Sequence, residues 1–104
     1  LTGRDEKQSF YEVEDRSVAS DVADVLARDT VQERPVLVIA RDNDLCHVSA
    51  RAPGTSDLNL GELIHEAAVR CGGFGGGHRR RAGATVACSR IGEFRDTLGR
   101  MGVA

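Results

Sequence analysis

A run of glycines followed by four basic side chains is the part of this sequence best suited to chemistry. Five of the twelve glycines lie within residues 72–77, and His78, Arg79, Arg80 and Arg81 follow at once. Main-chain amides without neighbouring side chains can surround phosphate oxygens, and guanidinium groups can pair with them in a bidentate manner. The segment is therefore predicted to bind an anion, with phosphate the leading candidate.

The local pattern predicts a short helix over residues 78–82. This segment contains no proline, glycine or β-branched residue, and Gly83 follows where a helix often ends in a left-handed glycine. Residues 75–77 would lead into that helix, and its first amides would face the anion. The alternative is a flexible glycine loop with solvated arginines. It is less favoured because flexible linkers are normally mixtures of glycine and serine.

The same stretch does not match two common nucleotide-binding motifs. Gly72 and Gly77 have the spacing of a P-loop, but His78 and Arg79 stand where lysine and serine or threonine are required. No Gly-x-Gly-x-x-Gly register fits, and a helical pattern precedes the glycines in place of a strand. ATPase and dinucleotide-binding functions are therefore disfavoured.

Charge is distributed unevenly along the chain. Residues 1–66 carry seven basic and fourteen acidic residues, a net charge of −7, whereas residues 67–104 carry seven and two, a net charge of +5. A basic C-terminal region around the glycines suits an anionic ligand. The overall net charge of −2 is too low to suggest non-specific binding to duplex DNA.

Length and composition predict one small domain. The chain has 104 residues, of which 40% are hydrophobic and 29% charged, and it contains no long apolar run or secretory signal. We expect a cytoplasmic protein. Because the chain begins at Leu1 and not at Met, we expect it to be part of a longer protein. Cys46, Cys71 and Cys88 are expected to be buried, reduced thiols, with no metal cluster or disulfide framework.

The N-terminal half predicts a tail, a helix and a hairpin. Residues 1–16 are polar and are expected to be a linker or tail, in which Phe10–Val13 can form a short edge strand. Ser17 is a candidate N-cap for a helix that ends near residues 28–30. The apolar face of that helix is expected to consist of Val18, Val22, Val25 and Leu26.

A buried strand is expected at residues 36–40 and a second at residues 45–52, joined by turn residues 42–44. Alternation places His47, Ser49 and Arg51 on one face of the second strand. This face is predicted to be either solvent-exposed or a binding surface.

The C-terminal half predicts two further helices and a strand. Leu60, Leu63, Ile64, Ala67 and Ala68 follow helical spacing over Leu60–Arg70. A strand is expected at residues 84–88, and a last helix from Ser89 or Arg90 to Gly102. The fold class is therefore α/β (mixed α+β), with helices packed on a small mixed sheet in a single domain. Arg51 and the glycine run each flank a strand, so they can meet at one edge of that sheet.

Two motifs resemble a known family. The sequence Gly-Gly-Gly-His-Arg-Arg-Arg-Ala-Gly-Ala at residues 75–84 resembles the Gly-Gly-Gly-His-x-x-Ala-Ala-Gly signature of the DHH-associated C-terminal domain, the substrate-binding half of DHH phosphoesterases. Residues 48–51, Val-Ser-Ala-Arg, are similar to the Val-Ser-x-Arg motif of that domain. The resemblance covers about residues 34–88. Arg81 departs from it, because the family usually has alanine there.

The resemblance implies a role for each matching residue. The implied substrate-binding residues are Arg51, Gly75, Gly76, Gly77, His78 and Arg79. The glycines would let the main chain close on a nucleotide phosphate, His78 would contact phosphate or base, and Arg51 would pair with phosphate. Arg79 and Arg81 are additional candidates of lower rank, and Arg80 is expected to point to solvent.

The family also has a separate N-terminal catalytic domain with an Asp-His-His motif that binds manganese or magnesium. This sequence contains no such motif. We therefore expect residues 17–104 to bind substrate without hydrolysing it and without a cofactor of their own. The implied parent protein is a metal-dependent phosphodiesterase or exonuclease. Its implied partners are single-stranded nucleic acid or a short oligonucleotide, and the DHH domain of the same chain.

Alternatives from other classes remain open. The first is an RNA-binding and dimerisation appendage similar to that of alanyl-tRNA synthetases, and the second is a freestanding enzyme. Phe74 can stack on a base or fill the core. His47 can line the site, although a surface position is favoured, and His65 is expected to be a surface residue.

Overall fold

The structure is a computed structural model that describes residues 3–5, 10–29, 35–53 and 57–103. Within these residues, six strands form one sheet in the order β1-β2-β3-β4-β6-β5. The strands are β1 (Gly3–Asp5), β2 (Phe10–Val13), β3 (Val36–Asp42), β4 (Leu45–Arg51), β5 (Phe74–Gly77) and β6 (Arg81–Ala87). Only β2 and β3 pair in parallel, and the other neighbours are antiparallel.

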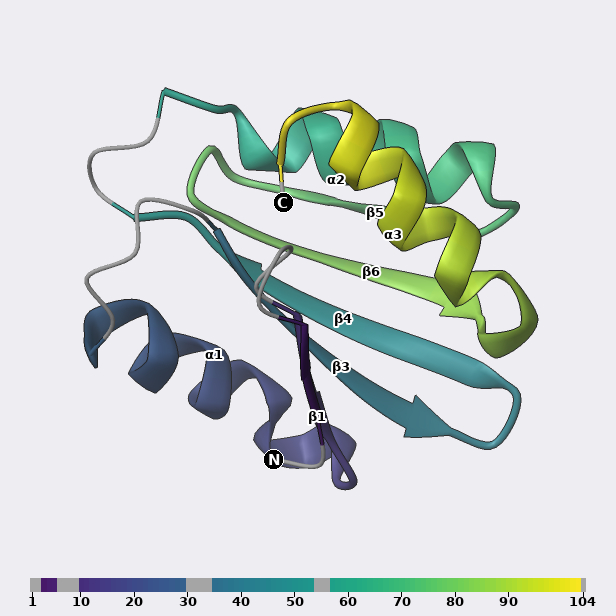
Figure 1. The fold of residues 1–104 in the computed structure, drawn as a ribbon, viewed down its shortest axis with the longest axis horizontal. Helices are drawn as coiled ribbons and strands as arrows, with labels where there is room; N and C mark the ends of the chain where they lie inside the picture. The colour runs from purple at the N-terminus through teal and green to yellow at the C-terminus, as the bar shows by residue number, and fades with distance from the viewer. Residues whose placement is uncertain (1–2, 6–9, 30–34, 54–56, 104) are drawn as a thin grey trace.

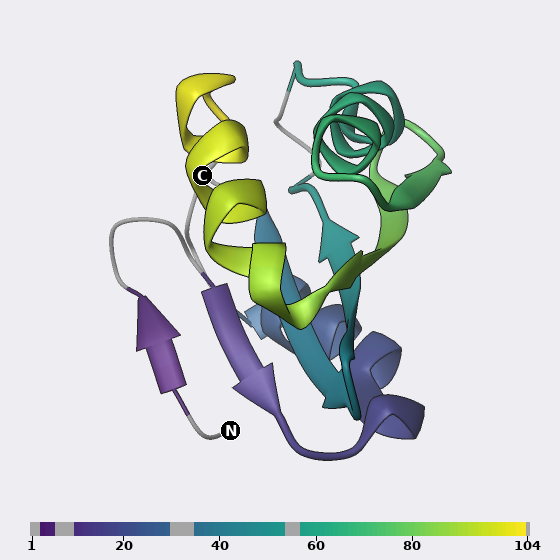
Figure 2. The same ribbon diagram turned by 90° about the vertical axis from the view of Figure 1, so that its right-hand side faces the viewer.

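Helices cover both faces of this mixed sheet. They are α1 (Ala19–Asp29), α2 (Leu60–Arg70) and α3 (Ile91–Arg100), with short 3-10 turns at Arg16–Val18 (η1) and Cys88–Arg90 (η2). Helices α2 and α3 lie together on one face, and α1 lies on the other (Figure 1, Figure 2). This arrangement confirms the expected fold class.

Alternation along the strands gives each face its own core. On the α1 side, Val36, Val38 and Ala40 of β3 pack with Ala19 and Ala23. On the α2 and α3 side the buried side chains include Leu37, Ile39, Val48, Leu60, Ile64, Val86, Phe94 and Leu98. Since β3 is buried on both faces, its continuous apolar run is explained.

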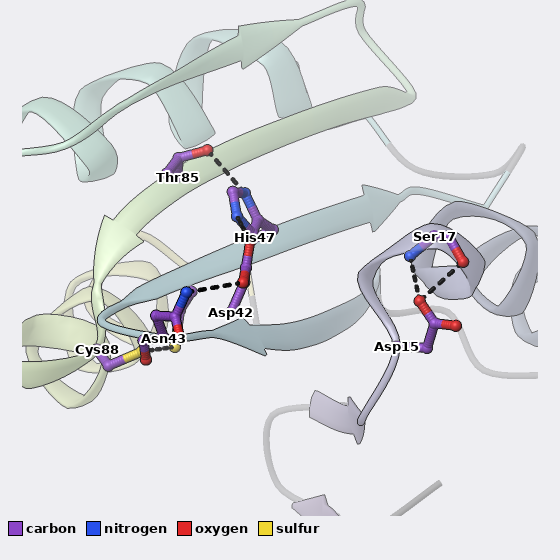
Figure 3. Close-up of polar contacts among 8 residues, drawn as sticks. Asp15, Ser17, Asp42, Asn43, His47, Thr85 and Cys88 are labelled. Atoms are coloured by element: carbon purple, nitrogen blue, oxygen red, sulfur yellow. Dashed lines mark hydrogen bonds and ion pairs between the residues drawn. The ribbon is translucent and has the colours of Figure 1, made fainter.

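Two of the N-terminal expectations are corrected here. The strand at Phe10–Val13 is present, but it is an inner strand between β1 and β3 and not an edge. Ser17 does not cap α1. Its amide and hydroxyl both donate to Asp15 Oδ1, at 2.8 and 2.7 Å (Figure 3). These two bonds lower the pKa of Asp15.

The buried face of α1 also differs from the expected one. Ala19 and Ala23 are buried with Val22 and Leu26 beside them, whereas Val18 and Val25 are exposed. Alanines mark the inner face because the helix lies close to the strands. The predicted apolar face was therefore wrong for Val18 and Val25, which face solvent.

The later elements follow the predictions closely. The β3–β4 hairpin turns at Asn43, whose φ of 54° is left-handed, and α2 spans the predicted residues 60–70. Asn59 caps α2 by accepting from the amide of Glu62 at 3.3 Å. Helix α3 buries Phe94 and Leu98, and Gly102 follows it with φ of 79°.

The helix predicted at residues 78–82 is wrong. Residues 74–77 form β5, residues 78–80 turn, and β6 already begins at Arg81. The amide of His78 donates to the carbonyl of Arg81 at 2.7 Å, which closes a β-hairpin whose last pair is Gly77 and Ala82. A helix of one turn is costly to nucleate, whereas β6 gains a complete ladder with β4.

Candidate functional site

The β5–β6 turn is fixed by main-chain hydrogen bonds to two other elements. We call residues 78–81 the basic turn. The carbonyls of His78, Arg79 and Arg80 accept from the amides of Gly61 (2.9 Å), Leu60 (2.8 Å) and Ala52 (2.9 Å), respectively. The first amides of α2 are thus occupied by the turn, so they are not an anion site. The result is a basic turn whose main chain is held between the start of α2 and the end of β4.

Close packing within the chain explains most of the glycines. A Cβ on Gly77 would lie 2.5 Å from Arg81 O, and one on Gly75 would lie 2.7 Å from Gly83 O. A Cβ on Gly61 of α2 would lie 2.5 Å from Gly77 O, so helix and strand approach at their backbones. At Gly75 and Gly77, packing within the chain is therefore sufficient to require glycine, whether or not a ligand approaches.

Gly76 differs from its neighbours. Its φ is +153° and that of Gly77 is +147°, both in the region that disfavours other residues. However, the nearest atom to a Cβ on Gly76 is His65 Cβ at 3.8 Å, which is an ordinary contact. Only the backbone conformation requires glycine at this position.

His65 supports the glycine strand, a role that the sequence did not reveal. It is exposed on α2, as expected, and its Nδ1 donates to the carbonyl of Gly75 at 2.9 Å. This bond satisfies a main-chain oxygen of the edge strand β5. Because the two residues belong to different elements, only their placement in space connects them.

The four side chains of the basic turn are exposed, and two of them donate to groups on other elements. Arg79 donates to the carbonyl of Asp57 at 3.1 Å, before α2, whereas Arg81 donates to Asp24 Oδ1 at 3.2 Å, on α1. Within the described part of the chain, the side chains of His78 and Arg80 make no hydrogen bond or ion pair. These two groups are thus the most accessible to an anion.

Arg51 lies beside the turn, but its guanidinium is engaged. It pairs across the β4–β6 ladder with Arg81, so the two side chains share a face of the sheet. Arg51 is only 8% exposed. Its Nε donates to Asp24 Oδ1 at 2.7 Å, and another nitrogen donates to Ala50 O at 2.8 Å. Arg51 and the glycine hairpin therefore meet as expected, with one carboxylate neutralising much of the charge of both arginines.

An uncovered part of the sheet extends from Arg81 along β5 and β6. Register places Phe74 beside Thr85, on the same face as Arg81, and the Gly76–Gly83 pair lies between them. We call these five residues the open strip. Helix α1 packs against β3 and β4 on this face, where Ser20 Oγ lies 3.2 Å from Ser49 Oγ. The face of His47, Ser49 and Arg51 is thus mostly a packing surface for α1, and the open strip lies next to it.

Phe74 is exposed on the open strip, at 69% of its surface, so it does not fill the core. In the same row, His47 Nδ1 lies 3.2 Å from Thr85 Oγ1 (Figure 3). His47 is partly buried and not the surface residue that was expected. Its Nε2 lies 3.8 Å from Asp42 Oδ2, beyond hydrogen-bond distance, and is buried with no hydrogen-bond partner among the described residues.

A comparison with protein families now places the chain. The DHHA1 domain model matches residues 8–101. The chain belongs to the DHHA1 domain family. This confirms the resemblance inferred from the glycine-histidine and Val-Ser-x-Arg motifs, and it extends the matched region beyond residues 34–88.

Solved structures similar to this DHHA1 domain share its fold at low sequence identity. They include the C-Ala domain of Aquifex aeolicus alanyl-tRNA synthetase, with a TM-score of 0.64 and 19% identity over 86% of each chain. A DHH domain protein described as a member of a family of ribosomal proteins has a TM-score of 0.59 and 15% identity over 90% of this chain. A pGpG-specific phosphodiesterase from Vibrio cholerae has a TM-score of 0.56 and 14% identity over 88% of this chain.

The chain spans 25% and 32% of the length of the latter two proteins, respectively. No curated protein matches it.

Two further features limit where chemistry can occur in the described part of this DHHA1 domain. It contains no group of three or more His, Cys, Asp or Glu side chains that could hold a metal ion. A surface hollow of about 580 Å³ is lined by Glu14, Asp15, Ser17, Arg41 and Asp42. Asp42 and Arg51 lie at opposite ends of the β3–β4 hairpin, so this hollow is remote from the basic turn. Its three carboxylates disfavour an anion.

Among the described residues, no helix has the length and apolar character needed to cross a membrane.

Proposed function

We propose that this DHHA1 domain binds the phosphate of a nucleotide or of a single-stranded nucleic acid end. It would hold that substrate for a metal-dependent DHH phosphoesterase domain elsewhere in the parent protein. Manganese or magnesium would belong to that other domain, since the described residues offer no suitable group of ligands. The parent protein would be an exonuclease or an oligonucleotide phosphodiesterase.

The accessible basic turn is the observation that carries this proposal. The side chains of His78 and Arg80 have no partner among the described residues, and Arg79 and Arg81 are exposed beside them. The main chain beneath them is fixed by hydrogen bonds to α2 and β4, so little backbone freedom would be lost on binding. Guanidinium and imidazole groups held in this way suit a phosphate group.

Arg51 contributes to the proposed site through Asp24. Its Nε and Arg81 share the same carboxylate oxygen, at 2.7 and 3.2 Å. A phosphate that approaches Arg81 would compete with Asp24 for both guanidinium groups. Gly75, Gly76 and Gly77 would offer only main chain beside this position, where packing and backbone conformation already require glycine.

Titration with a 5′-phosphorylated dinucleotide tests the proposal. Relative to wild type, His78→Ala and Arg81→Ala are each expected to weaken binding about tenfold, because each removes a charge-assisted hydrogen bond. Wild-type affinity is expected to fall with salt, and the Arg81→Ala slope of log K against log salt to be about 0.7 shallower. Arg70→Ala is the matched control. This variant lacks an exposed arginine at the end of α2 away from the basic turn, so it should bind the dinucleotide as tightly as wild type does.

The proposal fails if wild type, His78→Ala and Arg81→Ala bind the dinucleotide equally. The alternative of an RNA-binding or dimerisation appendage is supported only by the fold that the chain shares with the C-Ala domain. Tight binding of tRNA, with no response to the phosphorylated dinucleotide, would favour that alternative.

A further inference from the structure

Phe74 lies on the same uncovered sheet face as Arg81, at the other end of the open strip. Register places Phe74 opposite Thr85 and Arg81 opposite Arg51, with the Gly76–Gly83 pair between these two rows. Phe74 is 69% exposed, which is the highest value among the large exposed hydrophobic side chains of the described residues. An aromatic ring so open to water contributes little to stability, because it buries little apolar area.

The middle of the strip consists of two partly exposed glycines, which carry no side chains of their own. Gly76 and Gly83 lie side by side in adjacent strands, so the surface between Phe74 and Arg81 is main chain. The row of Phe74 and the turn after Gly77 are separated by about 10 Å, from three residues of extended strand. The open strip thus has basic side chains at one end, glycine main chain in the middle and an aromatic ring at the other end.

We propose that Phe74 is the platform for a nucleobase, so that the open strip binds one nucleotide lengthwise. The phosphate would lie at the basic turn, the sugar over Gly76 and Gly83, and the base against the Phe74 ring. Stacking on an aromatic side chain tolerates any base, since every base has a π face. This inference rests on the proposed function and adds the requirement that the ligand carry a base.

Paired ligands with and without a base test this proposal. We would titrate adenosine 5′-monophosphate and ribose 5-phosphate into the isotopically labelled chain and follow amide chemical shifts. Wild type is expected to bind the nucleotide at least about tenfold more tightly than ribose 5-phosphate, because it gains base stacking. Phe74→Leu keeps apolar bulk without the ring. It is expected to abolish this preference and leave the affinity for ribose 5-phosphate unchanged.

The matched control is Val69→Ala, which removes an exposed apolar side chain of α2, on the opposite face of the sheet from the open strip. It should retain the preference for the nucleotide. If ribose 5-phosphate binds but Phe74→Leu retains the preference, the base platform is excluded and phosphate binding stands. If neither ligand binds wild type, the proposed function and this inference both fail.

Two cysteines lie close together on the sheet face that α2 and α3 cover. Cys46 Sγ and Cys88 Sγ lie 2.9 Å apart, although 42 positions separate them in the sequence. Cys46 is fully buried on β4, whereas Cys88 is partly exposed where β6 meets η2. The amide of Cys88 donates to Asp44 O at 2.8 Å, which holds this corner against the β3–β4 turn.

We infer that Cys46 and Cys88 can form a reversible disulfide with a small disulfide as the oxidant. The Cys88 sulfur would attack oxidised glutathione, giving a mixed disulfide and one glutathione thiol. The Cys46 sulfur would then attack the Cys88 sulfur, forming the protein disulfide and releasing a second glutathione thiol. A bond of about 2.0 Å requires only a small approach of the two sulfur atoms. Burial is the main reason that the pKa of Cys46 is raised to about 12, so Cys88 is the sulfur that reacts first.

Intact mass measurement after treatment with oxidised glutathione tests this inference. Wild type is expected to lose the mass of two hydrogen atoms, with no attached glutathione, and to unfold at a higher temperature than the reduced protein. Cys46→Ser should instead retain glutathione on Cys88, while Cys71→Ser should behave as wild type. Persistent glutathionylation of wild-type Cys88, or a disulfide that includes Cys71, would overturn the inference.

Discussion

Asp24 controls how much positive charge the proposed site presents. One of its oxygens accepts from both Arg51 and Arg81. We predict that Asp24→Asn strengthens binding of the phosphorylated dinucleotide severalfold, because the two guanidinium groups no longer compete with a carboxylate. The same change should lower the free energy of unfolding, since the nearly buried Arg51 loses its charged partner. Isothermal titration and urea unfolding measure the two effects. Weaker binding by a folded Asp24→Asn protein would contradict the assigned role of Asp24.

We predict that ionisation of Cys46 lowers the free energy of unfolding at alkaline pH. Burial is the largest cause that raises the pKa of its thiol from 9.0 to about 12, and the contact with Cys88 adds to it. The unfolded chain therefore loses this proton before the folded protein does, so stability is complete below pH 9.0 and falls towards pH 12. Cys46→Val, which has no ionisable group at this buried position, should lose less stability over that range. Equal losses by both proteins in urea unfolding would exclude Cys46 as the cause.

Single residues of the site were only partly predictable from the sequence. Residue type and position were sufficient to expect exposed basic side chains at His78 and Arg79, although these residues were predicted to be helical. The burial of Arg51 could not be foreseen, since its partner Asp24 lies 27 positions away on another element. The same holds for His65, which reaches Gly75 only once α2 packs against β5.

At the scale of elements, the glycine strand β5 allows two layers to approach at their backbones. We predict that Gly77→Ala lowers the free energy of unfolding by about 1–3 kcal/mol, because its φ is +147° and the new Cβ would lie 2.5 Å from Arg81 O. Gly92→Ala in α3 is the matched control. Its Cβ meets no atom within 4 Å, so it should raise stability by about 0.5–1 kcal/mol through helix propensity. Urea unfolding checks both values, and a Gly77→Ala protein as stable as wild type would contradict this account.

Elements with a clear pattern in their own sequence were predicted well, whereas strands that depend on pairing with distant segments were not. Helix α2 has both a capping residue and an apolar face, and its predicted bounds coincide with Leu60–Arg70. Residues 78–82 favour a helix by local propensity. They form a turn and the start of β6 because β4 and β5 supply ladder partners on both sides. Strand pairing of this kind depends on distant segments and outweighs propensity.

At the scale of the whole molecule, the uneven charge of the sequence becomes a separation in space. The hollow lined by Glu14, Asp15 and Asp42 lies near one end of the β3–β4 hairpin, and the basic turn lies near the other. An anionic ligand is therefore attracted to one end and repelled from the other. This polarity, together with membership of the DHHA1 family, supports binding of substrate by one end of the domain.

Amide chemical-shift mapping with a 5′-phosphorylated dinucleotide tests the central claim most directly. The ligand is expected to shift the amides of residues 74–85 and of Arg51, to saturate, and to lose its effect as salt is raised. Amides around Glu14, Asp15 and Arg41 should remain unchanged. Saturable shifts centred on that acidic hollow, or no saturable shift at the basic turn, would contradict the claim that His78 and its neighbouring arginines bind phosphate.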